Sequence, residues 1–74
     1  MDEDLFARQV QIERKTITFT LRQNPRGRFL RITEDVGSRR DTVIIPATGL
    51  DAILATLQEI RQIDKNTPPA PART

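Results

Sequence analysis

The sequence predicts an α+β fold in which a four-stranded antiparallel sheet is followed by one C-terminal helix. Three observations support this. Apolar residues alternate with polar ones through residues 6–33, a second apolar run at residues 42–45 ends at a proline, and the apolar spacing becomes helical after residue 48. With 74 residues the chain has room for one domain.

The first three predicted strands lie within residues 6–33. In residues 6–13, Val10 and Ile12 point one way and glutamines point the other. The segment 16–22 is the clearest strand, with one face formed by Ile17, Phe19 and Leu21 and the other by Thr16, Thr18, Thr20 and Arg22.

Residues 23–27 (Gln-Asn-Pro-Arg-Gly) predict a turn, because asparagine tolerates a left-handed backbone, proline presets its φ and glycine accepts a positive φ. The strand beginning at Arg28 would pair with the strand before the turn as an antiparallel hairpin. Its inward residues would be Leu30 and Ile32, and its outward residues Phe29, Arg31 and Thr33.

A loop is expected at residues 34–40, and a fourth strand at residues 42–45 ends at Pro46. The face of this strand stays open, because three consecutive residues are apolar. Thr48 is the predicted N-cap of the helix, with Asp51 three residues later. We expect its apolar stripe to cover one face of the sheet and to form a dimer seam; the stripe comprises Leu50, Ile53, Leu54, Leu57 and Ile60.

The predicted domain division is a flexible start at residues 1–5, a folded unit at 6–64 and a disordered proline-rich tail at 65–74. The early residues are acidic and no apolar run is long enough to span a membrane. We therefore expect a cytoplasmic protein without a membrane partner, nucleoid-associated if bacterial, with a nuclear location open if eukaryotic.

A chain of this size is marginally stable alone, and small folds compensate with disulfides, metals or oligomerisation. The chain has no cysteine and no histidine, so oligomerisation is the expected route. The same inventory argues against catalysis, because the common general base and thiol nucleophile are absent. We expect no enzyme activity, cofactor, metal or small-molecule substrate.

The basic residues are concentrated rather than spread. The net charge is only +2, yet residues 13–40 hold eight basic residues against three acidic ones. Ten of the 12 basic residues are arginine, whose planar guanidinium suits phosphates and base edges.

The open face of the predicted sheet would therefore carry small hydroxyls, arginines and the exposed ring of Phe29. Such a face suits single-stranded nucleic acid, since bases stack on rings while phosphates meet the cations. Simpler explanations remain: Phe29 packs at an interface, the arginines maintain solubility, and Asn24 only forms a turn. The rival class is a protein-interaction or structural dimer.

Residues 13–36 (ERKTITFTLRQNPRGRFLRITEDV) resemble the repeat of the PUR family, the purine-rich-element-binding, Pur-alpha-like proteins. The most specific part is residues 21–32 (LRQNPRGRFLRI), and the resemblance covers about residues 8–63. It implies a ββββα repeat that intertwines with a second repeat, so a single-repeat chain would form an intertwined homodimer.

The resemblance also implies that the nucleic-acid contacts are made by Arg22, Asn24 and Arg26, with Phe29 stacking against bases. Arg14 and Lys15 form a further candidate patch, although Glu13 beside them would repel phosphate. Arg28 and Arg31 complete the candidate site. Threonines replace the aromatic residues that some relatives carry on the second strand, which implies weaker binding. The expected ligand is purine-rich, G-containing single-stranded DNA or RNA, in a role such as transcription regulation.

Overall fold

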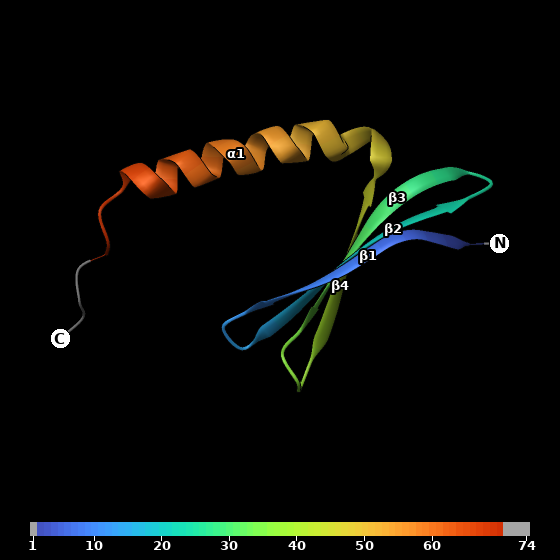
Figure 1. Cartoon of the computed structure of the whole chain (residues 1–74), viewed down its shortest axis with the longest axis horizontal. Coiled ribbons are helices and arrows are strands. Elements are labelled where there is room, and N and C mark those ends of the chain that lie inside the picture. Colours follow the sequence, from blue (N-terminus) through green and yellow to red (C-terminus); the bar gives the residue numbers. More distant parts are fainter. Residues whose placement is uncertain (1, 71–74) are drawn as a thin grey trace.

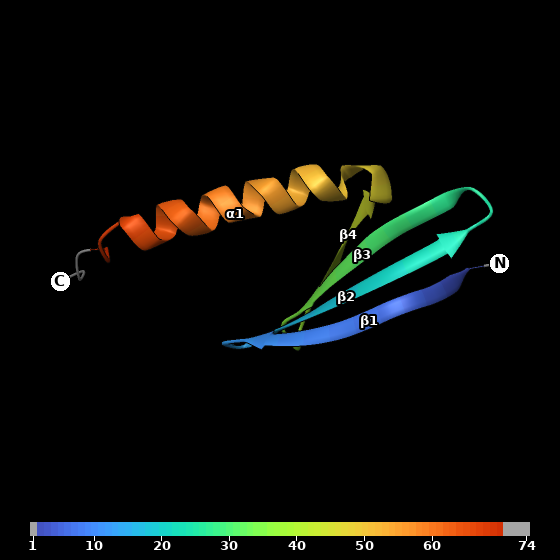
Figure 2. The same cartoon turned by 45° about the horizontal axis from the view of Figure 1, so that its top comes forward.

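Four strands form one antiparallel sheet in which each strand pairs with its neighbour in the sequence, in the order β1-β2-β3-β4. The structure is a computed structural model and describes residues 2–70 (Figures 1 and 2). Its elements are β1 (Glu3–Ile12), β2 (Lys15–Asn24), β3 (Gly27–Asp35), β4 (Arg40–Pro46), a short 3₁₀-helix η1 (Ala47–Gly49) and helix α1 (Leu50–Asn66). The predicted ββββα order is confirmed.

The register of β2 and β3 fixes the two faces of the sheet, because residues directly opposite each other point to the same side. One face carries the pairs Thr18–Thr33, Thr20–Arg31 and Arg22–Phe29; we call it the polar face. The other carries Phe19–Ile32 and Leu21–Leu30; we call it the apolar face. Both assignments agree with the alternation predicted from the sequence.

Strand β4 resolves the question that its apolar run left open. Val43 lies opposite Ile32 and Ile45 opposite Leu30, so both belong to the apolar face. Ile44 lies opposite Arg31 and therefore belongs to the polar face. An isoleucine at the edge of the polar face gives a nonpolar margin beside the central arginine.

Strand β1 begins at Glu3, so residues 3–5, which were expected to belong to a flexible start, are part of the sheet. Polar residues extend the strand because they find partners on β2: Glu3 lies opposite Gln23 and Asp4 opposite Arg22. The register shifts between Asp4 and Phe6, which places a bulge at Leu5. A bulge of this kind turns the following side chains to the other face.

Two tight turns join the first three strands. Glu13 and Arg14 form the first, with Glu13 in the left-handed region at a φ of 55°. Pro25 and Arg26 form the second, as predicted, and Gly27 follows with a φ of 138°, where a side chain would be strained. The β3–β4 loop is shorter than expected, because Glu34, Asp35 and Arg40 belong to strands.

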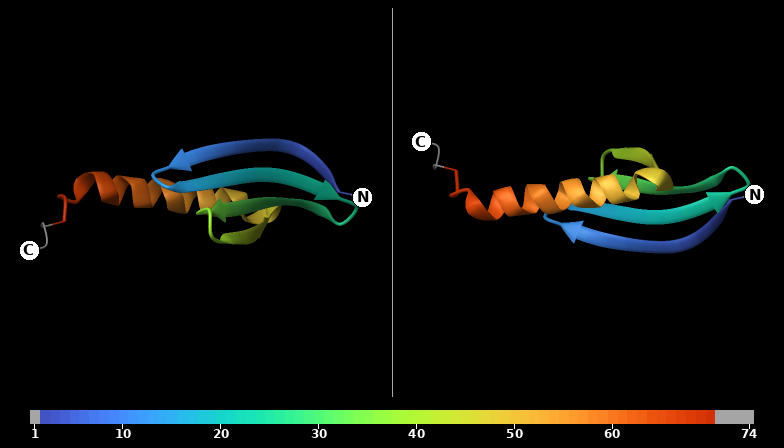
Figure 3. Two further views of the ribbon diagram at one scale, coloured as in Figure 1. Left: turned by 90° about the horizontal axis from the view of Figure 1, so that it is seen from below. Right: turned by 90° about the horizontal axis from the view of Figure 1, so that it is seen from above.

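Helix α1 does not cover the sheet, so the expectation that its stripe packs on the chain's own apolar face is wrong. Its main contacts run to η1, and the helix extends past the sheet rather than lying on it (Figures 1 and 3). Leu54 and Leu57 are each 56% exposed, and none of the helix residues is buried. The turn through η1 directs the helix outward, so its apolar stripe finds no cover within one chain.

The start of the helix also differs from the prediction. Thr48 lies inside η1, and the residue before the helix is Gly49, with no side-chain hydrogen bond at the cap. Asp51 lies in the first turn, where its charge suits the helix dipole. At the other end, the helix continues through Lys65 and Asn66, which the sequence assigned to the disordered tail. The predicted tail residues 71–74 lie outside the described residues.

Within residues 2–70 no hydrophobic side chain is fully buried. The radius of gyration is 15.7 Å, against about 11 Å for a compact domain of this length. No helix in the described part of the chain is long and apolar enough to cross a membrane.

Candidate nucleic-acid interface

Arg31 and Thr20 lie opposite each other near the centre of the polar face. Thr20 is 6% exposed, because Ala7 on β1 and Arg31 on β3 flank it on either side. Of the residues that the structure describes, no carboxylate lies within ion-pair distance of Arg31. The guanidinium of Arg31 is therefore available to an anionic ligand.

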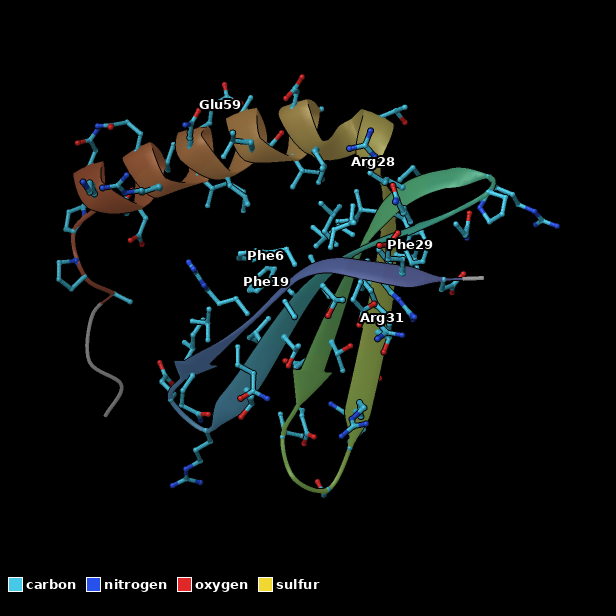
Figure 4. All side chains as sticks on the ribbon, turned by 45° about the vertical axis from the view of Figure 1, so that its right-hand side comes forward. Phe6, Phe19, Arg28, Phe29, Arg31 and Glu59 are labelled. Carbon is cyan, nitrogen blue, oxygen red and sulfur yellow. The ribbon has the colours of Figure 1, made fainter. Side chains whose placement is uncertain are left out.

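Phe29 lies between Arg22 on β2 and Pro46 on β4, toward the Asn24–Gly27 end of the sheet (Figure 4). Phe29 is half-buried, whereas the sequence predicted an exposed ring. Cross-strand neighbours flank the ring on both sides and leave part of it open. A ring restrained in this way is suited to stacking against a base, since little conformational entropy is lost on contact.

The hairpin turn beside Phe29 is held by Asn24. Its side-chain Oδ1 accepts a hydrogen bond from the backbone N–H of Arg26 at 2.8 Å. This is the structural role that the sequence left open for Asn24. The side-chain amide group still has both N–H donors for a ligand, whereas Oδ1 is shared with the turn. Arg26 is exposed at the tip of the hairpin.

A shallow groove of about 230 Å³ runs along the polar face away from Phe29. Hydroxyl, amide and charged groups line it, from Gln9, Thr16, Thr18, Arg31, Thr33, Asp35 and Arg40. Arg40 donates a hydrogen bond from Nη2 to Asp35 Oδ2 at 3.1 Å, so the far end of the groove is charge-balanced. The positive end of the groove is the one near Arg31.

Arg28 faces away from this groove. It lies opposite Gln23, and the register places both on the apolar face, so the predicted site does not form one continuous surface. Arg28 instead lines a second groove at the hairpin end, together with Arg26, Gly27, Pro46, Ala47 and Thr48. The hairpin tip therefore borders the second groove, whereas the first groove begins farther along the sheet at Arg31.

Arg14 and Lys15 lie at the opposite end of β2 from Asn24, about 30 Å away along the strand. Lys15 Nζ is 2.8 Å from Glu34 Oε2, and its register places it on the apolar face. The hydrogen bond and charge of Glu34 raise the pKa of Lys15, and those of Lys15 lower the pKa of Glu34. The structure thus separates this predicted patch from the rest of the site.

Asp35 is a groove residue that the sequence analysis missed. Its Oδ1 accepts a hydrogen bond from the backbone N–H of Gly37 at 2.8 Å. That bond, followed by the hydrogen bond from Arg40, lowers the pKa of Asp35. The available signal was the Asp-x-Gly spacing, which is typical of a side-chain-closed turn. It indicates a loop but does not reveal that the carboxylate borders a groove.

Asp4 is the second residue that was missed. Its carboxylate Oδ1 lies 2.6 Å from Nε of Arg22, one of the predicted contact residues. No sequence signal pointed to this pair, because strict alternation from Phe6 would place Asp4 on the apolar face. In the described part of the chain no cluster of three or more histidine, cysteine, aspartate or glutamate side chains is arranged to hold a metal ion.

These features define a ββββα module with a cationic, partly aromatic polar face at its hairpin end. No family model matches the chain. A comparison with curated proteins finds a relative that is 40% identical over 53 residues, the "Transcription factor Pur-alpha 1" of Arabidopsis thaliana. The match covers 72% of this chain and 18% of the relative, so the chain spans about a fifth of that protein's length. Together with the ββββα order, this match supports the predicted assignment of the chain to the PUR-repeat family.

Proposed function

We propose that this chain is a non-enzymatic protein that binds purine-rich, G-containing single-stranded DNA or RNA as a homodimer. The observation that carries the proposal is the neighbourhood of Phe29. A restrained aromatic ring lies beside Arg22, near the Asn24 turn and on the same face as the unpaired Arg31. Stacking on the ring and phosphate contacts to the arginines are the two interactions by which proteins hold single strands.

The match to a transcription factor of the Pur-alpha type supports a nucleic-acid ligand and favours a role in transcription regulation. The threonines of β2 add hydroxyl donors and acceptors across the polar face, but no second ring. Binding should therefore depend strongly on Phe29 and on charge, and it should weaken as salt is raised.

The homodimer is supported by the surface that one chain leaves open. The accessible area is 6698 Å², against about 4,600 Å² for a folded monomer of 8.4 kDa. The excess of about 2,000 Å² per chain is of the size that permanent dimers bury. Much of it is apolar, including Phe6 and Val43 on the sheet and the stripe of α1. In the proposed dimer, each helix covers the apolar face of the partner's sheet.

The test titrates a fluorescently labelled G-rich single strand at two salt concentrations, beside a pyrimidine-rich strand and a duplex of the same G-rich sequence. We expect the tightest binding for the G-rich single strand and a steep loss of affinity at the higher salt. Light scattering on the same samples should give twice the chain mass. A dimer that binds none of the three probes at low salt would favour the rival function, a protein-interaction module.

A further inference from the structure

The N-terminal end of β1 and the residue before it bring two carboxylates, Asp4 and Asp2, within ion-pair distance of Arg22. The bulge at Leu5 shifts the register, so that Asp4 lies directly opposite Arg22. Without the bulge, Leu5 would take that position and Asp4 would point to the apolar side. The bulge therefore aims a negative charge at a residue of the candidate interface.

The contact between Asp4 and Arg22 is close. Asp4 Oδ1 lies 2.6 Å from Arg22 Nε, and Asp2 Oδ2 lies 3.9 Å from Arg22 Nη2. The side chain of Arg22 is only 22% exposed, so solvent screens the pair less than it screens a fully exposed one. In the free chain, Arg22 therefore has two carboxylates within ion-pair distance.

The same contact leaves Arg22 with an unused donor. Of the residues that the structure describes, Arg22 Nε is the one buried side-chain nitrogen or oxygen without a hydrogen-bond partner. The Asp4 oxygen lies close to it but off the N–H direction, so the pair is held by charge and not by a hydrogen bond. A phosphate or base oxygen placed along that N–H would form a better contact than Asp4 does.

The segment that carries Asp4 is held in place from the other face. Gln23 donates a hydrogen bond from Nε2 to Glu3 Oε1 at 2.9 Å, next to the Asp4–Arg22 pair. Glu3 and Asp4 thus meet Gln23 and Arg22 of β2 on opposite faces of the sheet. By contrast, Arg26 and Arg31 have no carboxylate within ion-pair distance in residues 2–70.

We propose that Asp4, assisted by Asp2, is an intramolecular competitor for Arg22 that a nucleic-acid phosphate must displace. The inference rests on the proposed function. In this proposal, Asp4 lowers the affinity for nucleic acid through its ion pair with Arg22, a proposed contact residue. Removing its charge should free Arg22 for phosphate and tighten binding.

The test compares Asp4→Asn with Asp41→Asn in the full chain. Asp41 is a matched control because it also pairs with an arginine, Arg39, at 3.4 Å, but on the β3–β4 loop side of the sheet. Both substitutions change the net charge equally and release one arginine. The probe is the G-rich single strand, titrated over a range of salt concentrations.

We expect Asp4→Asn to tighten binding about fivefold at low salt, the effect of removing one nearby like charge from a phosphate site. The slope of log affinity against log salt should steepen by about 0.7, the value for one more phosphate contact on a single strand. Asp41→Asn should change the slope little. In an Arg22→Ala background, Asp4→Asn should no longer tighten binding.

Weaker binding by Asp4→Asn would overturn the inference and make Asp4 a residue that orients Arg22. Equal tightening by both variants would also overturn it, because net charge alone would then account for the effect. If the unaltered dimer and both variants fail to bind any strand at low salt, the proposed function fails, and the inference fails with it. If the unaltered dimer binds and Asp4→Asn binds with the same affinity, the inference fails and the proposed function stands.

Discussion

The two faces of the sheet differ in how far their side chains are covered. The apolar face has side chains that suit a core but no layer covering them: the helix extends away, and residues such as Ile12 and Val43 are more than half exposed. The polar face has its most covered residue, Thr20, at its centre and available cations around it. Burial therefore does not identify the core of this protein, because within residues 2–70 no element of the chain covers the apolar face.

The largest expected effect comes from placing a charge on the helix stripe. Leu57→Asp would put a carboxylate into the proposed seam and should cost about 3–5 kcal/mol per subunit, through lost burial and charge desolvation. Light scattering should show loss of the dimer, accompanied by unfolding in circular dichroism. Gln62→Asp, on the opposite side of the helix by its spacing, is the matched control and should remain a dimer. An intact Leu57→Asp dimer would place the seam elsewhere.

The next effect lies on the polar face. Phe29→Ala should weaken binding of the G-rich strand by about 1–3 kcal/mol, because the stacking surface is lost. Phe6→Ala is the comparison, since Phe6 belongs to the apolar face and packs under Arg8, whose Cζ lies 5.2 Å from the ring centroid. Phe6→Ala should mainly lower the thermal stability of the dimer, with a smaller effect on its affinity for the G-rich strand. If Phe29→Ala dimers bind with unchanged affinity, stacking on this ring is ruled out.

Arg28 and Arg31 offer a sharper comparison, since they lie on the same strand but on opposite faces. Arg31→Ala should weaken binding by about 1 kcal/mol and flatten the salt slope by about 0.7, as expected for one lost phosphate contact. Arg28→Ala should have a smaller effect on both quantities. Titration of both variants over a range of salt checks this. A larger effect of Arg28→Ala would indicate that nucleic acid binds in the groove between the hairpin and η1.

The smallest effect concerns acid stability. The pKa values of Glu34 and Asp35 are both lowered in the folded chain, by Lys15 on one face and by Gly37 and Arg40 on the other. A lowered carboxyl pKa contributes stability above the unfolded pKa, and this contribution is lost as the pH falls through the folded value. Stability should therefore decline below about pH 4. Glu34→Gln and Asp35→Asn should each reduce this decline in denaturant titrations at several pH values, and an unchanged decline would show that the pairs contribute nothing.

Much of the sheet follows from local sequence. The alternation of threonine with Ile17, Phe19 and Leu21 fixed the faces of β2, and the Asn-Pro-Arg-Gly turn fixed the hairpin register that brings Phe29 beside Arg22. These features depend on side-chain period and turn geometry, which neighbouring residues decide. The spacing of Leu50, Ile53 and Leu57 predicted the helix for the same reason.

The placement of the helix and of Asp4 was decided by the tertiary structure alone. An apolar stripe predicts that one face of a helix is to be buried, but it does not predict which surface covers that face. Here the chain's route through η1 carries α1 away from its own sheet. A one-residue bulge at Leu5 inverted the face of Asp4, which no alternation pattern anticipates. The sequence by itself determined which residues form each face, because that depends on local periodicity. The tertiary structure decided which charges meet Arg22 and which apolar surface remains open, because those depend on register and on the path of the chain between elements.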